Sequence, residues 1–156
     1  MRKPLLTHWV IIVTSFIHLC RLPVSAGQGS VPANPPESAS TEYLGDHPEL
    51  ILSTSQAWGE QGWNVAAHAP GIAGAPLQIG ERTYTKGLGH HANGAVQVLL
   101  DGEYACFNAE VGLQPCGGGG SVIFRVWVDG EPRFDSGIMR VTNARKMTLQ
   151  IGRAHV

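Results

Sequence analysis

The segment SVIFRVWV at residues 121–128 decides the fold class of this 156-residue chain. Trp127 lies between Val126 and Val128, and a turn-forming Asp-Gly pair follows the segment directly. Residues that alternate with a period of two are typical of a β-strand with one face on a core. The segment therefore predicts a strand, the strongest in the chain.

Similar short segments lie on both sides of it. Residues 104–111 (YACFNAEV) alternate so that Phe107, Ala109 and Val111 are expected to face the core. No stretch of the chain has helical periodicity over three turns, and six or seven strands separated by turns predict an all-β fold, a β-sandwich. The other expected strands or short apolar runs are residues 50–53, 77–79, 83–85, 95–100, 133–136 and 147–150.

The composition excludes several classes of protein. Charged residues make up 15% of the chain and the formal net charge is −1, so it has no basic field to hold a nucleic acid. The length suits one domain plus a leader and excludes a multi-domain enzyme within this chain. The 20 Gly and 10 Pro favour short strands and many turns.

Residues 1–26 are expected to be a signal peptide that lies outside the folded domain. A basic start (MRK) precedes an apolar run at residues 9–19, and Val24 and Ala26 are the small residues that a cleavage site after Ala26 needs. The alternative is a membrane anchor, but the run has about 11 residues and a spanning helix needs roughly 20. The mature protein is thus predicted to be secreted, periplasmic or on the cell surface, with no membrane span.

The rest of the chain divides into three parts. Residues 27–41 (GQGSVPANPPESAST) predict a flexible linker, and residues 42–150 predict the folded domain. Residues 151–156 (IGRAHV) match a translated sequencing-adapter read, so we expect a non-native tail and a gene that continues into a linked downstream domain. One or two strands would then be missing, which leaves an unpaired edge. The alternative is a natural short C-terminus.

Cys106 and Cys116 are the two cysteines left after cleavage, ten residues apart. Disulfides persist in exported proteins, so a bridge between them is expected to staple the strand at residues 104–111 to the loop that follows. Cys106 is expected to point away from the core. A zinc site is not expected, because no further Cys or His lies at finger spacing.

No catalytic motif is present. The chain has no Gly-x-Ser-x-Gly, no His-Glu-x-x-His and no phosphate loop, so an enzyme is not expected. His90 and His91 are bracketed by glycines and are expected to lie in a sharp turn. Neighbouring residues on a strand point in opposite directions, which disfavours a shared metal ion.

Aromatic residues suggest binding instead. Trp58 and Trp63 lie in the Gly-rich segment at residues 58–74. An exposed indole ring with a few fixed polar groups is typical of a small-ligand site, and it suits the apolar C–H face of a sugar. The alternative is that each Trp caps the end of the sandwich.

The motifs together resemble the NPCBM family, the "novel putative carbohydrate-binding module" of secreted glycoside hydrolases. The similarity covers about residues 43–150. Its most specific parts are the Lys-Gly-Leu-Gly-x-His-Ala run and the Val-x-Phe-x-Val-x-x-Asp-Gly strand. The matching segments are residues 58–59 (WG), 76–80 (PLQIG), 83–92 (TYTKGLGHHA), 107–112 (FNAEVG), 121–130 (SVIFRVWVDG) and 135–137 (DSG).

The resemblance implies a galactose-binding-like β-sandwich jelly roll without catalytic activity. It implies that the domain binds glycans, often galactose-containing ones, that it targets an attached glycoside hydrolase, and that it holds a structural calcium ion (Ca2+). By position, Lys86 and His91 are the expected polar contacts, Trp58 the stacking ring and Asn93 a minor contact. In the alternative for His91, its side chain only fixes the turn.

Two departures from the family pattern bear on these expectations. Residues 113–116 (LQPC) replace the family's acidic run, and hard cations prefer carboxylate and carbonyl oxygens. The family's C-terminal strand is absent. A second function is consistent with the same fold: a structural or interaction domain of a cell-surface protein without a sugar site.

Overall fold

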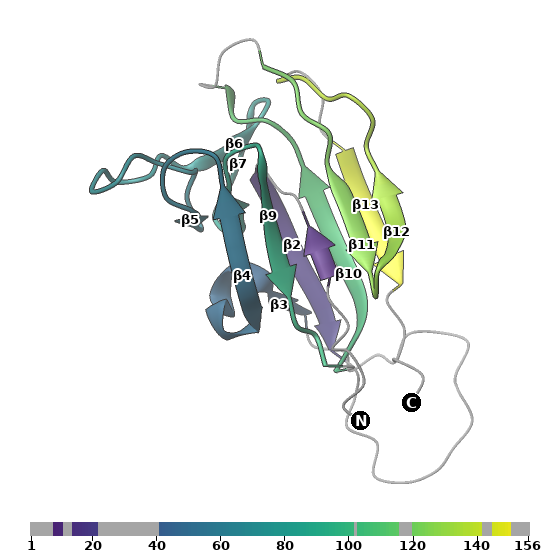
Figure 1. Cartoon of the computed structure of the whole chain (residues 1–156). Helices are drawn as coiled ribbons and strands as arrows, with labels where there is room; N and C mark the ends of the chain where they lie inside the picture. The colour runs from purple at the N-terminus through teal and green to yellow at the C-terminus, as the bar shows by residue number, and fades with distance from the viewer. Residues whose placement is uncertain are drawn as a thin grey trace, which may run out of the picture.

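The computed structural model describes residues 8–10, 14–21, 41–101, 103–115, 120–141 and 145–150 (Figure 1). Strands dominate these residues, and the only helices among them are two short 3-10 turns, so the predicted all-β class is confirmed. The jelly-roll connectivity stays a prediction. Residues 27–40 of the expected linker, the tail at 151–156 and Cys116 lie outside the described residues.

Two antiparallel sheets form the body of the domain. The five-stranded sheet has the order β12 (Glu131–Asp135), β11 (Arg125–Val128), β1 (His8–Val10), β9 (Gly94–Val98) and β4 (Ile51–Gln56). The six-stranded sheet has the order β13 (Arg145–Gln150), β10 (Tyr104–Val111), β2 (Thr14–Arg21), β8 (Leu88–Gly89) and β5 (Gly62–Trp63), with β3 (Thr41–Tyr43) paired to β2.

A small hairpin completes the fold. β6 (Leu77–Ile79) pairs with β7 (Arg82–Tyr84), as the sequence predicts within one residue. Gly80 has a φ of +59°, a conformation that glycine adopts without strain, and it makes the turn. The two 3-10 turns are η1 (Leu44–Asp46) and η2 (Pro48–Leu50), which lead from β3 into β4.

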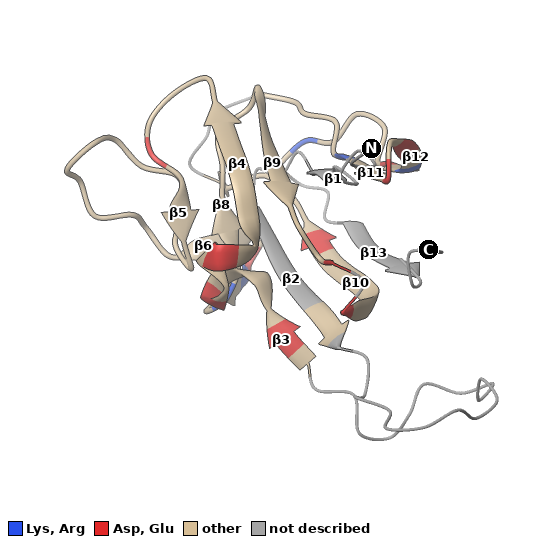
Figure 2. Cartoon of the chain, turned by 60° about the horizontal axis from the view of Figure 1, so that its bottom comes forward, with Lys and Arg blue, Asp and Glu red and all other residues tan. Residues whose placement is uncertain are grey.

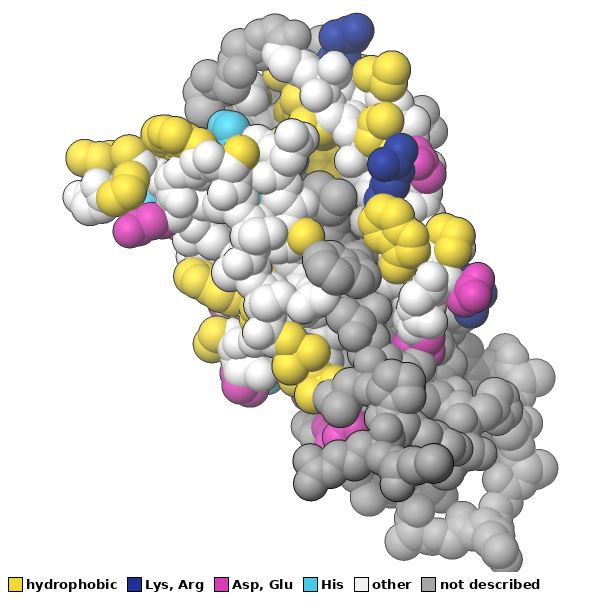
Figure 3. Space-filling model, viewed as in Figure 1, with side chains coloured by type: hydrophobic (Ala, Val, Ile, Leu, Met, Phe, Trp, Pro, Cys, Tyr) yellow, Lys and Arg dark blue, Asp and Glu magenta, His cyan; other side chains and the backbone are white. Residues whose placement is uncertain are grey.

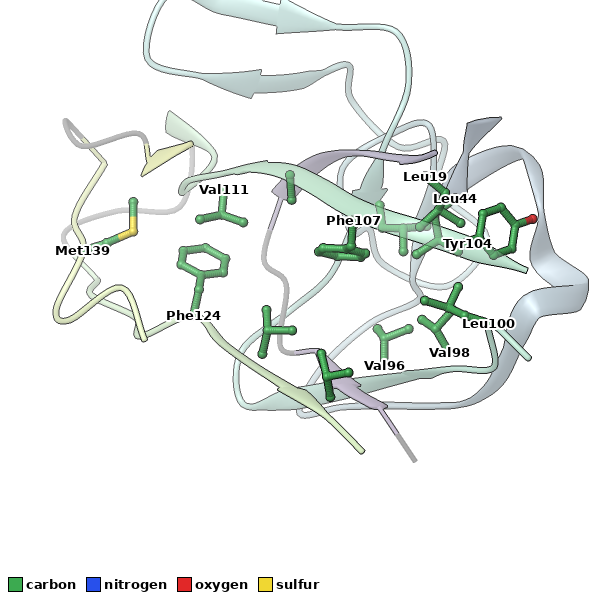
Figure 4. Close-up of a cluster of buried hydrophobic side chains, with 14 of the residues drawn as sticks. Leu19, Leu44, Val96, Val98, Leu100, Tyr104, Phe107, Val111, Phe124 and Met139 are labelled. Carbon is green, nitrogen blue, oxygen red and sulfur yellow. The ribbon is translucent and has the colours of Figure 1, made fainter. Parts of the chain in front are cut away.

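The core lies between the sheets, as Figure 4 shows. Phe107 and Val111 of β10 lie on one side, and Val96 and Val98 of β9 lie on the other. Of the strand predicted at residues 121–128, only Arg125–Val128 forms β11, whereas Phe124 just before it is fully buried in the same cluster. The alternation predicted for residues 104–111 is confirmed, because its three expected inward residues are all buried.

The N-terminal segment takes part in both sheets of the full chain, and cleavage after Ala26 stays a prediction. β1 lies between β9 and β11, and β2 lies between β10 and β8, so within the described residues each sheet is continuous through one of these two strands. Leu19 of β2 is fully buried in the core cluster. The physical reason is composition: an apolar run rich in Val and Ile suits a leader, and it equally suits a strand that is buried in the middle of a sheet.

The disulfide also differs from the expected Cys106–Cys116 bridge. Cys106 bonds to Cys20, which lies directly opposite it in the β10–β2 register. Cys20 lies within the expected signal peptide, so Cys116 was the only partner left for Cys106 in the expected mature chain. Cys106 is buried, but it is not part of the core cluster that contains Phe107, in line with the expectation that its side chain points away from the core.

Candidate functional site

Trp58 and His91 lie together although 33 residues separate them in the chain. Their ring centroids are 5.5 Å apart with an interplanar angle of 56°. Trp58 follows the end of β4 and is 52% exposed, and His91 lies in the exposed turn before β9. We call these two side chains the ring pair. The structure thus brings together the two residues on which the sequence-based site mainly depends.

Pairing of β4 with β9 brings the two segments together. The register joins Gln56 to Gly94, so the residues just after β4 and those just before β9 meet at the same end of the sheet. The side-chain Oε1 of Gln56 accepts a hydrogen bond from the backbone N–H of His91 at 3.1 Å. Gln56 therefore ties the turn that carries His91 to the strand that ends two residues before Trp58.

A polar cluster joins β4 and the loop after it to His90, the neighbour of His91. His90 is only 1% exposed, in contrast to its neighbour His91. Thr54 donates its hydroxyl proton to Oε1 of Gln61 at 2.6 Å, and the same hydroxyl oxygen lies 3.3 Å from Nε2 of His90.

Burial holds His90 in its neutral form. Burial, with a smaller contribution from the neighbouring His91, lowers the pKa of His90 to about 4, and the backbone carbonyl of Ser55 opposes this shift. This packing requires glycine at position 94, because any side chain there would collide with the His90 ring and with the Ser55 carbonyl. His90 is thus a core residue that fixes the turn, whereas His91 is displayed.

The other two predicted contacts have different surroundings. Asn93 is exposed two residues after His91, in the same turn. Lys86 instead forms an ion pair with Asp46, with Nζ 2.6 Å from Oδ1. This hydrogen bond from Lys86 lowers the pKa of Asp46, and the Asn64 amide adds to the effect. The ammonium of Lys86 is therefore paired with a carboxylate, and its part in binding stays a prediction.

Three supporting residues were missed by the sequence argument, namely Thr54, Gln56 and Gln61. Thr54, Gln56 and Trp58 are two residues apart, which places the first two on one side of β4. That spacing could have predicted that the two side chains lie on one side of a strand. The expected apolar run ended at residue 53, however, whereas β4 continues to Gln56. Gln61 gives no such signal, since its contact with Thr54 depends on how the loop after β4 turns back.

Charge and metal chemistry do not explain this site. Lys and Arg positions are few and lie in separate places on the ribbon of the described residues (Figure 2). Within the described ranges, no three side chains from His, Cys, Asp and Glu are placed to hold one ion. The same part of the chain contains no helix with the length and hydrophobicity needed to cross a membrane.

Comparison with known proteins identifies the family. The family described as "NPCBM/NEW2 domain" matches residues 40–156, from just before β3 to the end of the sequence. No curated protein and no solved structure matches the chain. The match covers three quarters of the sequence and agrees with the resemblance carried by the individual motifs. The chain therefore belongs to the NPCBM/NEW2 domain family, whose domains are carbohydrate-binding modules.

Proposed function

We propose that this chain is a non-catalytic module that binds glycans through the ring pair, Trp58 and His91. The observation that supports this most directly is their contact: an exposed indole and an exposed imidazole meet at one end of a rigid sheet. Family membership points to carbohydrate as the ligand. The hydrogen bond from the His91 N–H to Gln56 ties the turn that carries the imidazole to β4 before a ligand arrives.

The chemistry of the two rings suits a saccharide. The face of Trp58 offers apolar area for the C–H face of a sugar ring. The two ring nitrogens of His91 can form hydrogen bonds with hydroxyl groups, and the amide of Asn93 adds two donors and an acceptor. A shallow surface of this kind gives weak binding, on the order of Kd = 10⁻⁵–10⁻³ M.

Weak binding has a use when the module is tethered. A binding module raises the local concentration of substrate for whatever domain is linked to it. We therefore propose that the module directs an attached glycoside hydrolase to galactose-containing glycans, as the family resemblance implies. We also propose that the protein acts outside the cell, as domains of its family typically do.

Calcium plays no part in this proposal. The described residues supply no cluster of three acidic or histidine side chains, and residues 113–116 carry no carboxylate. Hard cations are bound by several oxygen ligands, so these residues do not fit the calcium site that the resemblance implies.

A glycan array tests the proposed function. The full chain is applied to immobilised galactosides and to other glycans, beside the variant Trp58→Ala. We expect retention on galactose-containing glycans for the full chain and loss of that retention for the variant. Silence across all glycans would contradict the proposal and would favour the structural or interaction domain without a sugar site.

A further inference from the structure

An apolar loop projects beside the ring pair. The chain between β5 and β6 extends away from the sheets in both views (Figures 1 and 2). Residues 69–76 (APGIAGAP) form its outer part, and none of their side chains has a hydrogen-bonding group. We call them the apolar loop. Ile72 within it is 61% exposed.

The loop has a defined shape. Its two arms are joined by a hydrogen bond from the N–H of Ala66 to the carbonyl of Ala75 at 2.8 Å. Its tip is a turn in which Ile72 N–H donates to the carbonyl of Ala69 at 3.1 Å, and Gly71 takes a φ of +75°. Because these backbone groups are paired within the loop, Ile72 is displayed with little further ordering cost.

Backbone contacts hold this loop next to Trp58. Glu60 and His68 exchange two hydrogen bonds, of 2.8 and 3.1 Å, so the chain just after Trp58 is paired with the residue just before the apolar loop. Gly59 packs so closely on the His68 carbonyl that any side chain there would collide with it. Hydrophobic side chains gather on this projection in Figure 3.

The chemistry of the loop selects what can lie on it. Further sugar rings would find no side-chain hydrogen-bond donors or acceptors on the apolar loop. Aliphatic chains, in contrast, would be stabilised by contact with it, because the contact removes apolar surface from water. Residues 57–76 contain no Lys or Arg, so the surface does not favour anionic lipids. Trp side chains suit the boundary between headgroups and acyl chains, where an apolar segment can be buried.

We propose that the ligand is the sugar headgroup of a glycolipid in a neutral membrane surface. The ring pair holds the sugar, and Ile72 enters the acyl boundary beside it. This inference rests on the proposed function and adds the ligand's lipid part to it. Binding to a membrane-displayed glycan is then tighter than binding to the same glycan free in solution.

The test compares one headgroup in two forms with the full chain. Its probes are free lactose, phosphatidylcholine vesicles containing lactosylceramide, and phosphatidylcholine vesicles alone. Ile72→Asp is expected to weaken binding to the lactosylceramide vesicles about tenfold, which corresponds to about 1.4 kcal/mol, and to leave the affinity for lactose unchanged. Ile138→Asp, at a residue that is 69% exposed in the segment after β12, is the matched control and should change neither.

Other outcomes overturn the inference in distinguishable ways. Equal binding of vesicles by Ile72→Asp and the unmodified chain shows that the loop does not touch lipid. Equal binding of vesicles with and without lactosylceramide shows that the sugar is not recognised there. A change of sedimentation mass in Ile72→Asp shows that the loop covers a second copy. Failure of the unmodified chain to bind lactose in either form refutes the proposed function for this sugar.

Discussion

The buried His90 makes the stability of this domain depend on pH. Its pKa is lowered to about 4 in the fold, mainly by burial, whereas an unfolded histidine has a value of 6.5. Between these values the unfolded chain binds the extra proton and the folded chain does not. The free energy of unfolding therefore rises with pH through this window, and the stability contributed by neutral His90 is lost as pH falls from 6.5 toward 4.

The size of the effect follows from the width of the window. Each pH unit is worth about 1.4 kcal/mol, so lowering the pH from 6.5 to 4.5 should cost about 2–3 kcal/mol from this one group. Urea unfolding, followed by Trp fluorescence at pH 4.5, 5.5, 6.5 and 7.5, measures the slope. The carboxylates of Asp46 and Asp135 have lowered pKa values, so they titrate below this range and do not obscure the slope.

Two neighbouring variants separate His90 from the rest of the chain. His90→Gln should flatten the slope between pH 4.5 and 6.5, and His91→Gln should keep it, because only His90 is buried. A slope that persists in His90→Gln would refute the reasoning. If that variant does not fold, an NMR titration of the imidazole protons of the unmodified chain decides the matter: a His90 ring that titrates near pH 6.5 contradicts the account.

Two further predictions concern the support of the ring pair and the disulfide. Gln56→Met removes the side-chain oxygen that accepts the hydrogen bond from the His91 N–H, so we expect at least threefold weaker glycan binding with a small change in melting temperature. Gln56→Glu keeps this oxygen and should keep most of the affinity. Equal loss of affinity in both variants would contradict this role for Gln56. In the full chain, Cys116→Ser should leave the Cys20–Cys106 cross-linked peptide intact in a non-reducing peptide map, and Cys20→Ser should abolish it. A protein cut after Ala26 retains only Cys106–Cys116 as an intramolecular pairing, so recovery of that peptide would show that the leader had left the fold.

Local patterns predicted much of the fold. β10 has the bounds that its alternation indicates, and the hairpin of β6 and β7 lies within one residue of its expected place. These segments are decided by period-two burial and by turn residues, which are local properties of a sequence. The place of β1 and β2 could not be predicted from local sequence, because the same apolar run is typical of a leader and of a strand in the middle of a sheet.

The candidate site was predictable only in part for a related reason. Trp58 and His91 were chosen one by one, from exposure expected beside glycines and from a motif, and the structure places their rings 5.5 Å apart. The partner of Lys86 was not predictable, because its pairing with Asp46 depends on how η1 packs against the turn before β8. Gln56 was missed because its role is a hydrogen bond to a backbone group 35 residues away.

The most direct measurement is the affinity of the ring pair for a galactoside, with a second tryptophan as the control. The affinity of the full chain for lactose is measured by ligand-observed NMR beside Trp58→Ala and Trp63→Ala. Trp63 is 39% exposed on β5, so its replacement removes a similar ring at another place. We expect at least a tenfold loss of affinity for Trp58→Ala, little loss for Trp63→Ala and similar melting temperatures for both. Equal affinities in all three proteins would contradict the claim that the indole of Trp58 holds the sugar.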